Sequence, residues 1–146
     1  MYPSRFRYEA PTSIEDAIVL LSAGEGDAKV LAGGQSLIPM MKLRFAGPAM
    51  LVDINNIPGL AYHHQEDDGT YRIGALCRHA DLEKSMTLAL HQPVIASAAH
   101  LVADPIVRTR GTVSYTHLRA HETYLLIAYA VFCLKRGGGG GGGGGG

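Results

Sequence analysis

The chain has 146 residues, enough for one domain of ordinary size and too few for two. Its 13 Lys and Arg residues balance 13 Asp and Glu residues, and charges of both signs are interspersed. This balance argues against a nucleic-acid partner and against binding to a membrane surface. Residues 1–7 contain no apolar run of the signal-peptide type, so we expect a cytoplasmic protein without a membrane span.

The first predicted elements are a short strand and an amphipathic helix. Residues 6–10 alternate between apolar and polar side chains, as a strand does. Thr12 or Ser13 is placed to cap the following helix, and Glu15 and Asp16 fall in its first turn, where the helix dipole favours acidic groups. Apolar side chains recur on one helical face from position 14 to position 21, and glycines at 24 and 26 mark the end.

Two glycines then join a strand-like run to a helix-like run. Residues 28–31 (AKVL) are of the buried-strand type, and residues 32–44 read AGGQSLIPMMKLR. Apolar positions in the second string recur at spacings of three and four, as on one face of a helix. We expect this helix to reach about residue 45 and a further strand to span residues 50–54.

The turn at Gly33 and Gly34 has the composition of an anion-binding turn. Both glycines can adopt positive φ and let a ligand approach the backbone closely. Ser36 can cap the helix and leave backbone N–H groups to face a phosphate. A plain strand-to-helix turn needs the same residue types, however, so these residues taken alone leave both interpretations open.

The elements so far follow in the order β-α-β-α-β, which favours parallel strands joined by helices. The two-glycine turn would then lie at the carboxyl end of a strand, the edge at which such sheets usually bind ligands. After Gly59 the pattern changes. Strand-like runs at residues 60–63 and 70–75 flank a polar turn and predict an antiparallel hairpin, and helical runs follow at residues 78–82 and 94–101.

The remaining reactive side chains form no catalytic or metal-binding pattern. Cys77 and Cys133 lie far apart without a C-x-x-C pair, so we expect buried thiols and neither a disulfide nor a zinc site. We expect His63 and His64 to be exposed polar surface. Three other histidines are not spaced as a cluster, and we expect structural roles for His79, His91 and His100. No catalytic residue is predicted, which fits a protein that holds a cofactor.

Residues 32–44 resemble the pyrophosphate-binding turn of the FAD-binding (medium) subunit of molybdenum hydroxylases, the carbon monoxide dehydrogenase and xanthine dehydrogenase family. The resemblance extends over about 112 of the 146 residues. It continues through residues 51–55 and 57–60, 72–76, 78–83, 103–105 and 108–112. The chain therefore resembles an N-terminal fragment of such a subunit.

The resemblance implies an α+β fold of the vanillyl-alcohol oxidase and cell-wall reductase type, with two FAD-binding subdomains. Residues 1–54 would form the first subdomain, and residues 55–112 would begin a second, truncated one. FAD would be held mainly by backbone N–H groups, and no contacting residue would act as an acid or base. The FAD-binding residues that the resemblance implies are Leu31, Ala32, Gly33, Gly34, Gln35, Ser36, Leu37, Ala103, Gly111 and Thr112.

The same resemblance implies a redox function. In the family, substrate is oxidised at a molybdenum cofactor on a large subunit, and electrons pass through 2Fe-2S clusters on a small subunit to the FAD of the medium subunit. The FAD then hands them to an external acceptor. The implied partners are these large and small subunits. The family continues after Thr112 into a glycine pair that also contacts FAD, whereas here Val113 is followed by Ser114 and Tyr115.

From residue 113 the sequence departs from the family. Residues 113–123 (VSYTHLRAHET) resemble a translated transposon-type sequencing adapter, residues 129–135 resemble the other end of such DNA, and residues 137–146 are all glycine. We interpret residues 113–146 as a non-native tail, with a disordered coil from residue 137. The competing interpretations are a metal site at His117 and His121 and a short amphipathic segment at residues 124–134.

Three hypotheses about function follow from the sequence. The first, which we favour for the parent protein, is the electron-transferring FAD subunit of a molybdenum hydroxylase. The second is a stand-alone flavin oxidase of the same fold. The third, of another class, is a non-functional truncated chimera, which applies to the 146-residue chain as it stands.

Overall fold

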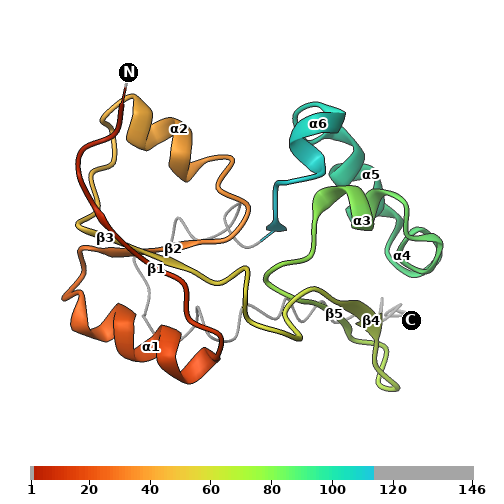
Figure 1. Cartoon of the computed structure of the whole chain (residues 1–146). Coiled ribbons are helices and arrows are strands. Elements are labelled where there is room, and N and C mark those ends of the chain that lie inside the picture. The colour runs from red at the N-terminus through yellow and green to blue at the C-terminus, as the bar shows by residue number, and fades with distance from the viewer. Residues whose placement is uncertain (1, 114–146) are drawn as a thin grey trace, which may run out of the picture.

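The computed structural model describes residues 2–113. The expectations for the tail, including those for Cys133, for the pair His117 and His121 and for the glycine run, lie outside the described residues. Within residues 2–113 the fold mixes helices and strands in two halves that lie side by side (Figure 1). No helix in this part is both long and apolar enough to cross a membrane.

The N-terminal half contains a parallel sheet of three strands (Figure 1). Strand β3 (Met50–Asp53) lies between β1 (Arg7–Glu9) and β2 (Ala28–Leu31), and both pairings are parallel. Helix α1 (Ile14–Ala23) connects β1 with β2, and helix α2 (Leu37–Lys42) connects β2 with β3. The predicted β-α-β-α-β order with parallel strands is confirmed.

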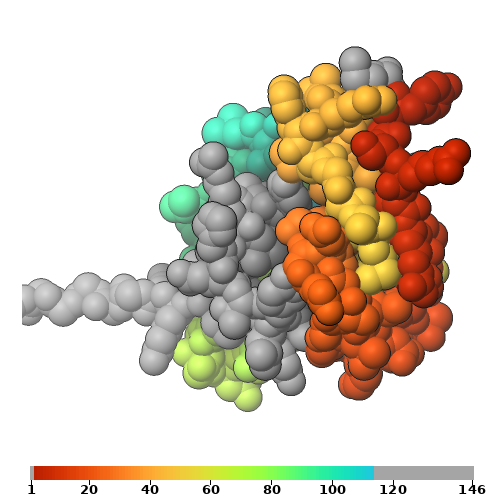
Figure 2. All heavy atoms as spheres, turned by 90° about the vertical axis from the view of Figure 1, so that its left-hand side faces the viewer, coloured from red at the N-terminus to blue at the C-terminus, as the bar shows by residue number. Residues whose placement is uncertain are grey.

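The two helices cover opposite faces of this sheet because side chains alternate along its central strand. Val52 packs in one buried cluster with Leu21 of α1, whereas its neighbour Leu51 packs in another with Met41 of α2. Figure 1 shows α1 below the strands and α2 above them. In the view of Figure 2, the N-terminal segment in red runs along the edge of this half of the molecule.

Helix α1 begins where the sequence predicts. Ser13 is its N-cap, and the Ser13 hydroxyl oxygen accepts a hydrogen bond from the Asp16 N–H at 3.1 Å. Glu15 and Asp16 stand in the first turn, as predicted. The helix ends at Gly24, and Gly26 adopts a φ of 96° just beyond it. Cap, charge and glycine are local signals, so the sequence alone suffices to place this helix.

Helix α2 is shorter than predicted, because its C-terminus folds into a Schellman motif at Arg44. Arg44 adopts a left-handed φ of 61°. The Phe45 N–H then donates to the Met40 carbonyl at 2.9 Å, and the Arg44 N–H donates to the Met41 carbonyl at 3.1 Å. The helix therefore ends at Lys42 rather than near residue 45.

The C-terminal half opens with the predicted antiparallel hairpin, β4 (His63–Gln65) and β5 (Tyr71–Ile73). The strand β4 starts later than expected. Before it, the Tyr62 carbonyl accepts from the Gly74 N–H at 2.7 Å and the Leu60 carbonyl accepts from the Leu76 N–H at 2.9 Å, outside the regular ladder.

One histidine of the hairpin differs from its prediction. His64 is exposed, as expected, but His63 is half-buried, and its Nδ1 atom lies 2.9 Å from the Tyr71 hydroxyl. Alternation along a strand turns neighbouring side chains to opposite faces, so only one of two adjacent histidines can face solvent fully. The expectation of two exposed histidines was therefore wrong for His63.

Short helices cover the hairpin (Figure 1). Two of them, α3 and α5, were predicted, and α5 includes Pro93, whose missing N–H is harmless in a first helical turn. Two others were not predicted, and each is too short to show a hydrophobic period. The four are α3 (His79–Glu83), α4 (Met86–His91), α5 (Pro93–Leu101) and α6 (Pro105–Arg108). Their core is a separate buried cluster that includes Leu82 and Leu88 and the hairpin residue Tyr71.

Candidate functional site

The two-glycine turn, residues 32–36, follows β2 at its carboxyl end and lies against a distant part of the chain. A Cβ atom at Gly33 would stand 2.5 Å from the Arg110 carbonyl oxygen and 2.7 Å from the Thr112 backbone nitrogen. The Gly33 N–H donates to the Thr112 hydroxyl oxygen at 3.2 Å. Glycine is needed at this position because two backbones meet there, not because of its φ angle.

Gly34 is the glycine whose φ angle matters. It adopts a φ of +74°, whereas Gly33 is not among the positive-φ residues. The Gly34 carbonyl accepts from the Ile38 N–H at 3.0 Å, so helical hydrogen bonding already begins at Gly34. The expected use of positive φ holds at one of the two glycines, and close backbone approach explains the other.

Ser36 does not cap α2, which corrects the sequence-based expectation. A capping serine has extended backbone angles, which let its oxygen reach the N–H groups of the first turn. Ser36 instead has φ −104° and ψ −46° and makes no side-chain cap bond. Because the helical pattern already includes Ser36, its hydroxyl is left at the surface of the turn.

The turn carries a run of backbone donors. Among residues 2–113, no acceptor is found for the N–H groups of Gly34, Gln35, Ser36 and Leu37. The Leu37 side chain is buried beside Met41, so only its N–H can serve a ligand. Four consecutive N–H groups next to a glycine are suited to bind an anion such as a phosphate.

The second predicted segment meets the turn. Arg78 and Thr112 form an antiparallel bridge, and the His79 N–H donates to the Gly111 carbonyl at 3.0 Å. A Cβ atom at Gly111 would lie 3.8 Å from the Gln35 side chain. The structure thus brings Gly111 and Thr112 to the turn.

Ala103 is placed differently from Gly111 and Thr112. It is exposed, with a φ of 46°, and its carbonyl accepts from the Arg108 guanidinium at 3.3 Å. Within the described residues no hydrogen bond joins Ala103 to the turn.

Asn55 and Arg78 also support the turn, and the sequence did not single them out. The Asn55 side-chain N–H donates to the Ala32 carbonyl at 2.8 Å, and the Arg78 guanidinium donates to the Asn55 side-chain oxygen at 2.9 Å. A second Arg78 N–H donates to the Arg110 carbonyl. The only sequence signal was their place within segments of family resemblance, since their partners lie 23 and 32 residues away.

His79 is buried directly behind Gly111. Burial lowers the pKa of its imidazole, the nearby Arg108 charge lowers it further, and a hydrogen bond with the Thr112 backbone acts in the opposite direction. The ring is therefore held neutral to a lower pH than an exposed histidine would be. This agrees with the structural role expected for His79.

We expect the protein to lose stability as the pH falls below about 6.5, the ordinary histidine pKa. Below that pH the unfolded chain protonates His79 while the folded chain does not, so the unfolded state binds more protons and unfolding becomes easier. Thermal unfolding of the wild type and His79→Gln between pH 5 and 8 measures this. The His79→Gln variant should show a weaker fall than the wild type, and an equal fall would contradict the effect assigned to the burial of His79.

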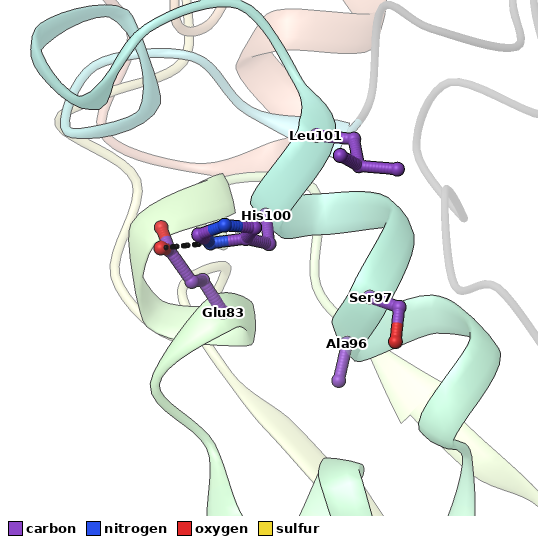
Figure 3. A pocket seen from close by; sticks show the side chains of 5 residues that line it. All are labelled: Glu83, Ala96, Ser97, His100 and Leu101. Atoms are coloured by element: carbon purple, nitrogen blue, oxygen red, sulfur yellow. Dashed lines mark hydrogen bonds and ion pairs between the residues drawn. The ribbon is translucent and has the colours of Figure 1, made fainter.

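Other groups in this half are paired and support the Arg110 segment. Arg108, which is buried, donates to Glu83 at 2.8 Å and to the Val102 carbonyl at 3.0 Å. Beside Glu83 lies an open hollow of about 380 Å³, where the His100 ring reaches the other Glu83 oxygen at 2.8 Å (Figure 3). The hydrogen bond from His100, aided by Arg108, lowers the pKa of Glu83. These residues pin α3, α5 and α6 together.

Cys77 is buried, as predicted, and burial raises the pKa of its thiol to about 12. The thiol therefore stays protonated near neutral pH and is a poor nucleophile or metal ligand. No group of three or more metal-binding side chains occurs within residues 2–113. The chemistry that the described residues offer is backbone hydrogen bonding at the two-glycine turn.

A family model described as the FAD binding domain in molybdopterin dehydrogenase matches residues 4–114. The chain belongs to this family. The carbon monoxide dehydrogenase medium chain of Hydrogenophaga pseudoflava is 50% identical over 113 residues, which are 77% of this chain and 39% of that protein. The 6-hydroxypseudooxynicotine dehydrogenase complex subunit alpha of Paenarthrobacter nicotinovorans is 46% identical over 113 residues, 77% of this chain and 38% of that protein.

Solved structures of related enzymes also match the fold of this chain. Carbon monoxide dehydrogenase from Hydrogenophaga pseudoflava superposes with a TM-score of 0.74 at 50% identity, over 78% of this chain and 39% of that one. Quinoline 2-oxidoreductase from Pseudomonas putida 86 gives 0.73 at 34% identity, over 78% and 39%. The chain thus spans about two fifths of the length of these relatives.

Proposed function

We propose that this chain is the N-terminal FAD-binding part of an electron-transferring subunit of a molybdenum-containing hydroxylase. The single observation that carries the proposal is the two-glycine turn, whose N–H groups at residues 34–37 have no acceptor within residues 2–113 and lie where the Arg110–Thr112 backbone closes over Gly33. Membership of the FAD-binding family and the relatives' roles as dehydrogenase chains support it. The proposal does not extend to the relatives' substrates, such as carbon monoxide.

We assign the binding of the FAD pyrophosphate to the turn and to the segment that meets it. The residues present fit this group, because a pyrophosphate needs several N–H donors and a backbone free of side chains. The proposed FAD-binding residues near one another are Leu31, Ala32, Gly33, Gly34, Gln35, Ser36, Leu37, Gly111 and Thr112. Ala103 stays a prediction from resemblance alone.

The bound FAD would supply the redox chemistry, since a flavin accepts and releases electrons and the residues that the structure describes present no catalytic group of their own. The chain's residues bind and orient it. We also propose the vanillyl-alcohol oxidase type of fold, with subdomains at residues 1–54 and 55–112. A cytoplasmic location and large molybdenum and small 2Fe-2S partner subunits complete the proposal.

A stand-alone flavin oxidase is the second candidate from the sequence. The relatives' names favour the first, because one is called a medium chain and another a subunit of a dehydrogenase complex. Turnover by the parent protein in the absence of partner subunits would favour the oxidase.

Titration of the full chain with FAD and with riboflavin tests the proposed function. Riboflavin has the same ring but no phosphate, so it offers no anion to the N–H donors of the turn. We expect FAD to bind more tightly than riboflavin by at least about tenfold, since a single hydrogen bond to a charged group is worth about 1.5–3 kcal/mol. Flavin fluorescence quenching measures both constants. Equal affinities, or no binding of FAD, would contradict the proposal.

A further inference from the structure

The turn is held in place by a side chain that uses both of its amide hydrogens and its oxygen in hydrogen bonds. Asn55 donates one amide hydrogen to the Ala32 carbonyl at 2.8 Å and the other to the Asp53 carboxylate at 2.6 Å. Its oxygen accepts from Arg78 at 2.9 Å. A flipped amide would set its oxygen against two acceptors and its nitrogen against a guanidinium, so only one orientation satisfies all three partners.

The Asp53 carboxylate keeps Asn55 in that orientation. Besides the Asn55 amide, it accepts from the Asn55 backbone N–H at 2.9 Å and from the Tyr8 hydroxyl at 2.5 Å. The hydrogen bonds from Tyr8 and Asn55 and the charge of Arg78 lower its pKa against the opposing effect of burial. Asn55 is thus fixed from the sheet side by the end of β3 and by β1.

Arg78 extends this contact to the other side of the site. One arm of its guanidinium donates to Asn55, and the other donates to the Arg110 carbonyl. Its backbone pairs with Thr112 and its N–H donates to Asp81 at 3.3 Å, so the base of the side chain is fixed as well. Only a planar guanidinium offers several donors in a rigid fork that can join two oxygens on different segments.

We propose that Asn55 and Arg78 are positioning residues that join the two-glycine turn to the Arg110–Thr112 segment and so preset the cofactor's binding surface. Neither is assigned a contact with the cofactor. They hold the Ala32 carbonyl on one side and the Arg110 carbonyl on the other, and Gly33 lies between these points against Arg110 and Thr112. Preset donors bind an anion without an ordering cost at the moment of binding. The inference rests on the proposed FAD site for its consequence but not for its geometry.

Arg78→Lys tests the inference, with Arg72→Lys as the matched control. Lysine keeps the charge but cannot reach two acceptors as a fork, whereas Arg72 pairs with Glu66 on the remote hairpin. The first readout is hydrogen exchange of the Gly33 amide in the full chain without flavin. We expect exchange about tenfold faster in Arg78→Lys and unchanged in Arg72→Lys, because the bond to Thr112 opens more often.

The second readout is the FAD dissociation constant, which should rise about tenfold in Arg78→Lys and stay unchanged in Arg72→Lys. Asn55→Asp provides a second variant, in which the side chain keeps its size. A carboxylate oxygen would replace the amide N–H groups and would face the Ala32 carbonyl and Asp53 without a hydrogen to donate. It should act in the same direction. Far-UV circular dichroism confirms that each variant is folded.

The two readouts separate this inference from the proposed function. Wild-type amide exchange in both Arg78→Lys and Asn55→Asp would overturn the positioning role, whatever the chain binds. Faster exchange with an unchanged FAD dissociation constant would overturn its consequence for the cofactor. If the wild type binds no FAD, the proposed function fails, and the exchange of the Gly33 amide alone then decides the positioning role.

Discussion

Replacing Gly33 with alanine is expected to abolish tight FAD binding and to destabilise the fold. The added methyl would lie 2.5 Å from the Arg110 carbonyl oxygen and 2.7 Å from the Thr112 nitrogen, and both atoms belong to the backbone. Backbone cannot rotate away as a side chain can, so the two segments must separate. Overpacking of this kind costs about 1–3 kcal/mol. The separation also breaks the Gly33 N–H bond to Thr112, so the FAD dissociation constant should rise more than about tenfold.

Gly47→Ala is the matched control for this substitution. No heavy atom of residues 2–113 lies within 4 Å of the position that its Cβ would take, and its φ is outside the left-handed region. The exchange should be neutral or stabilise by up to about 1 kcal/mol, because alanine restricts the unfolded chain. Urea unfolding of the flavin-free proteins and FAD titration measure both effects. Equal behaviour of the two variants would refute the close approach at Gly33.

The N-terminal half of the fold was predictable because its signals are local. Ser13, the acidic pair after it and the glycine at 24 mark helix α1 within a dozen residues. The order of strands and helices then limits the topology, since connections of this kind are nearly always right-handed and favour parallel pairing. What failed was the fine structure of short elements. The end of α2 depends on the left-handed angle at Arg44, which arginine rarely adopts and no pattern announces.

The candidate site was predictable only in part. Gly33, Gly34, Gly111 and Thr112 were named from resemblance, and the structure brings the two segments together. The positioning role of Asn55 could not be found from periodicity or spacing. Its hydrogen bonds join its own segment to Ala32 and to Arg78, which are both distant in sequence. Ser36 shows the opposite error. A serine before a helix is a good capping signal, yet Ser36 already has helical backbone angles, and helical hydrogen bonding begins at the Gly34 carbonyl, so the geometry on which capping depends is absent.

Leu88→Ala is expected to cause a large loss of stability in the C-terminal half. Leu88 is fully buried, at 0% exposure, in the cluster formed by α3, α4, α5 and the hairpin. Truncation of a buried leucine costs about 2–5 kcal/mol, a large part of the 5–15 kcal/mol that stabilise a typical domain. Urea unfolding measures the difference. Leu90→Ala on the same helix is the control, since Leu90 is 77% exposed and should change stability by less than about 0.5 kcal/mol.

The same variant links this core to the proposed cofactor site. Cys77 belongs to the Leu88 cluster, and its carbonyl accepts from the Val113 N–H at 3.4 Å, one residue beyond Thr112. A loosened cluster should therefore let the Arg110–Thr112 segment move away from Gly33, and FAD should bind more weakly to Leu88→Ala even under conditions in which the variant is folded. Leu90→Ala should bind FAD as the wild type does. If Leu88→Ala loses stability but keeps its FAD affinity, the C-terminal core and the two-glycine turn are energetically independent, and the turn alone carries the binding.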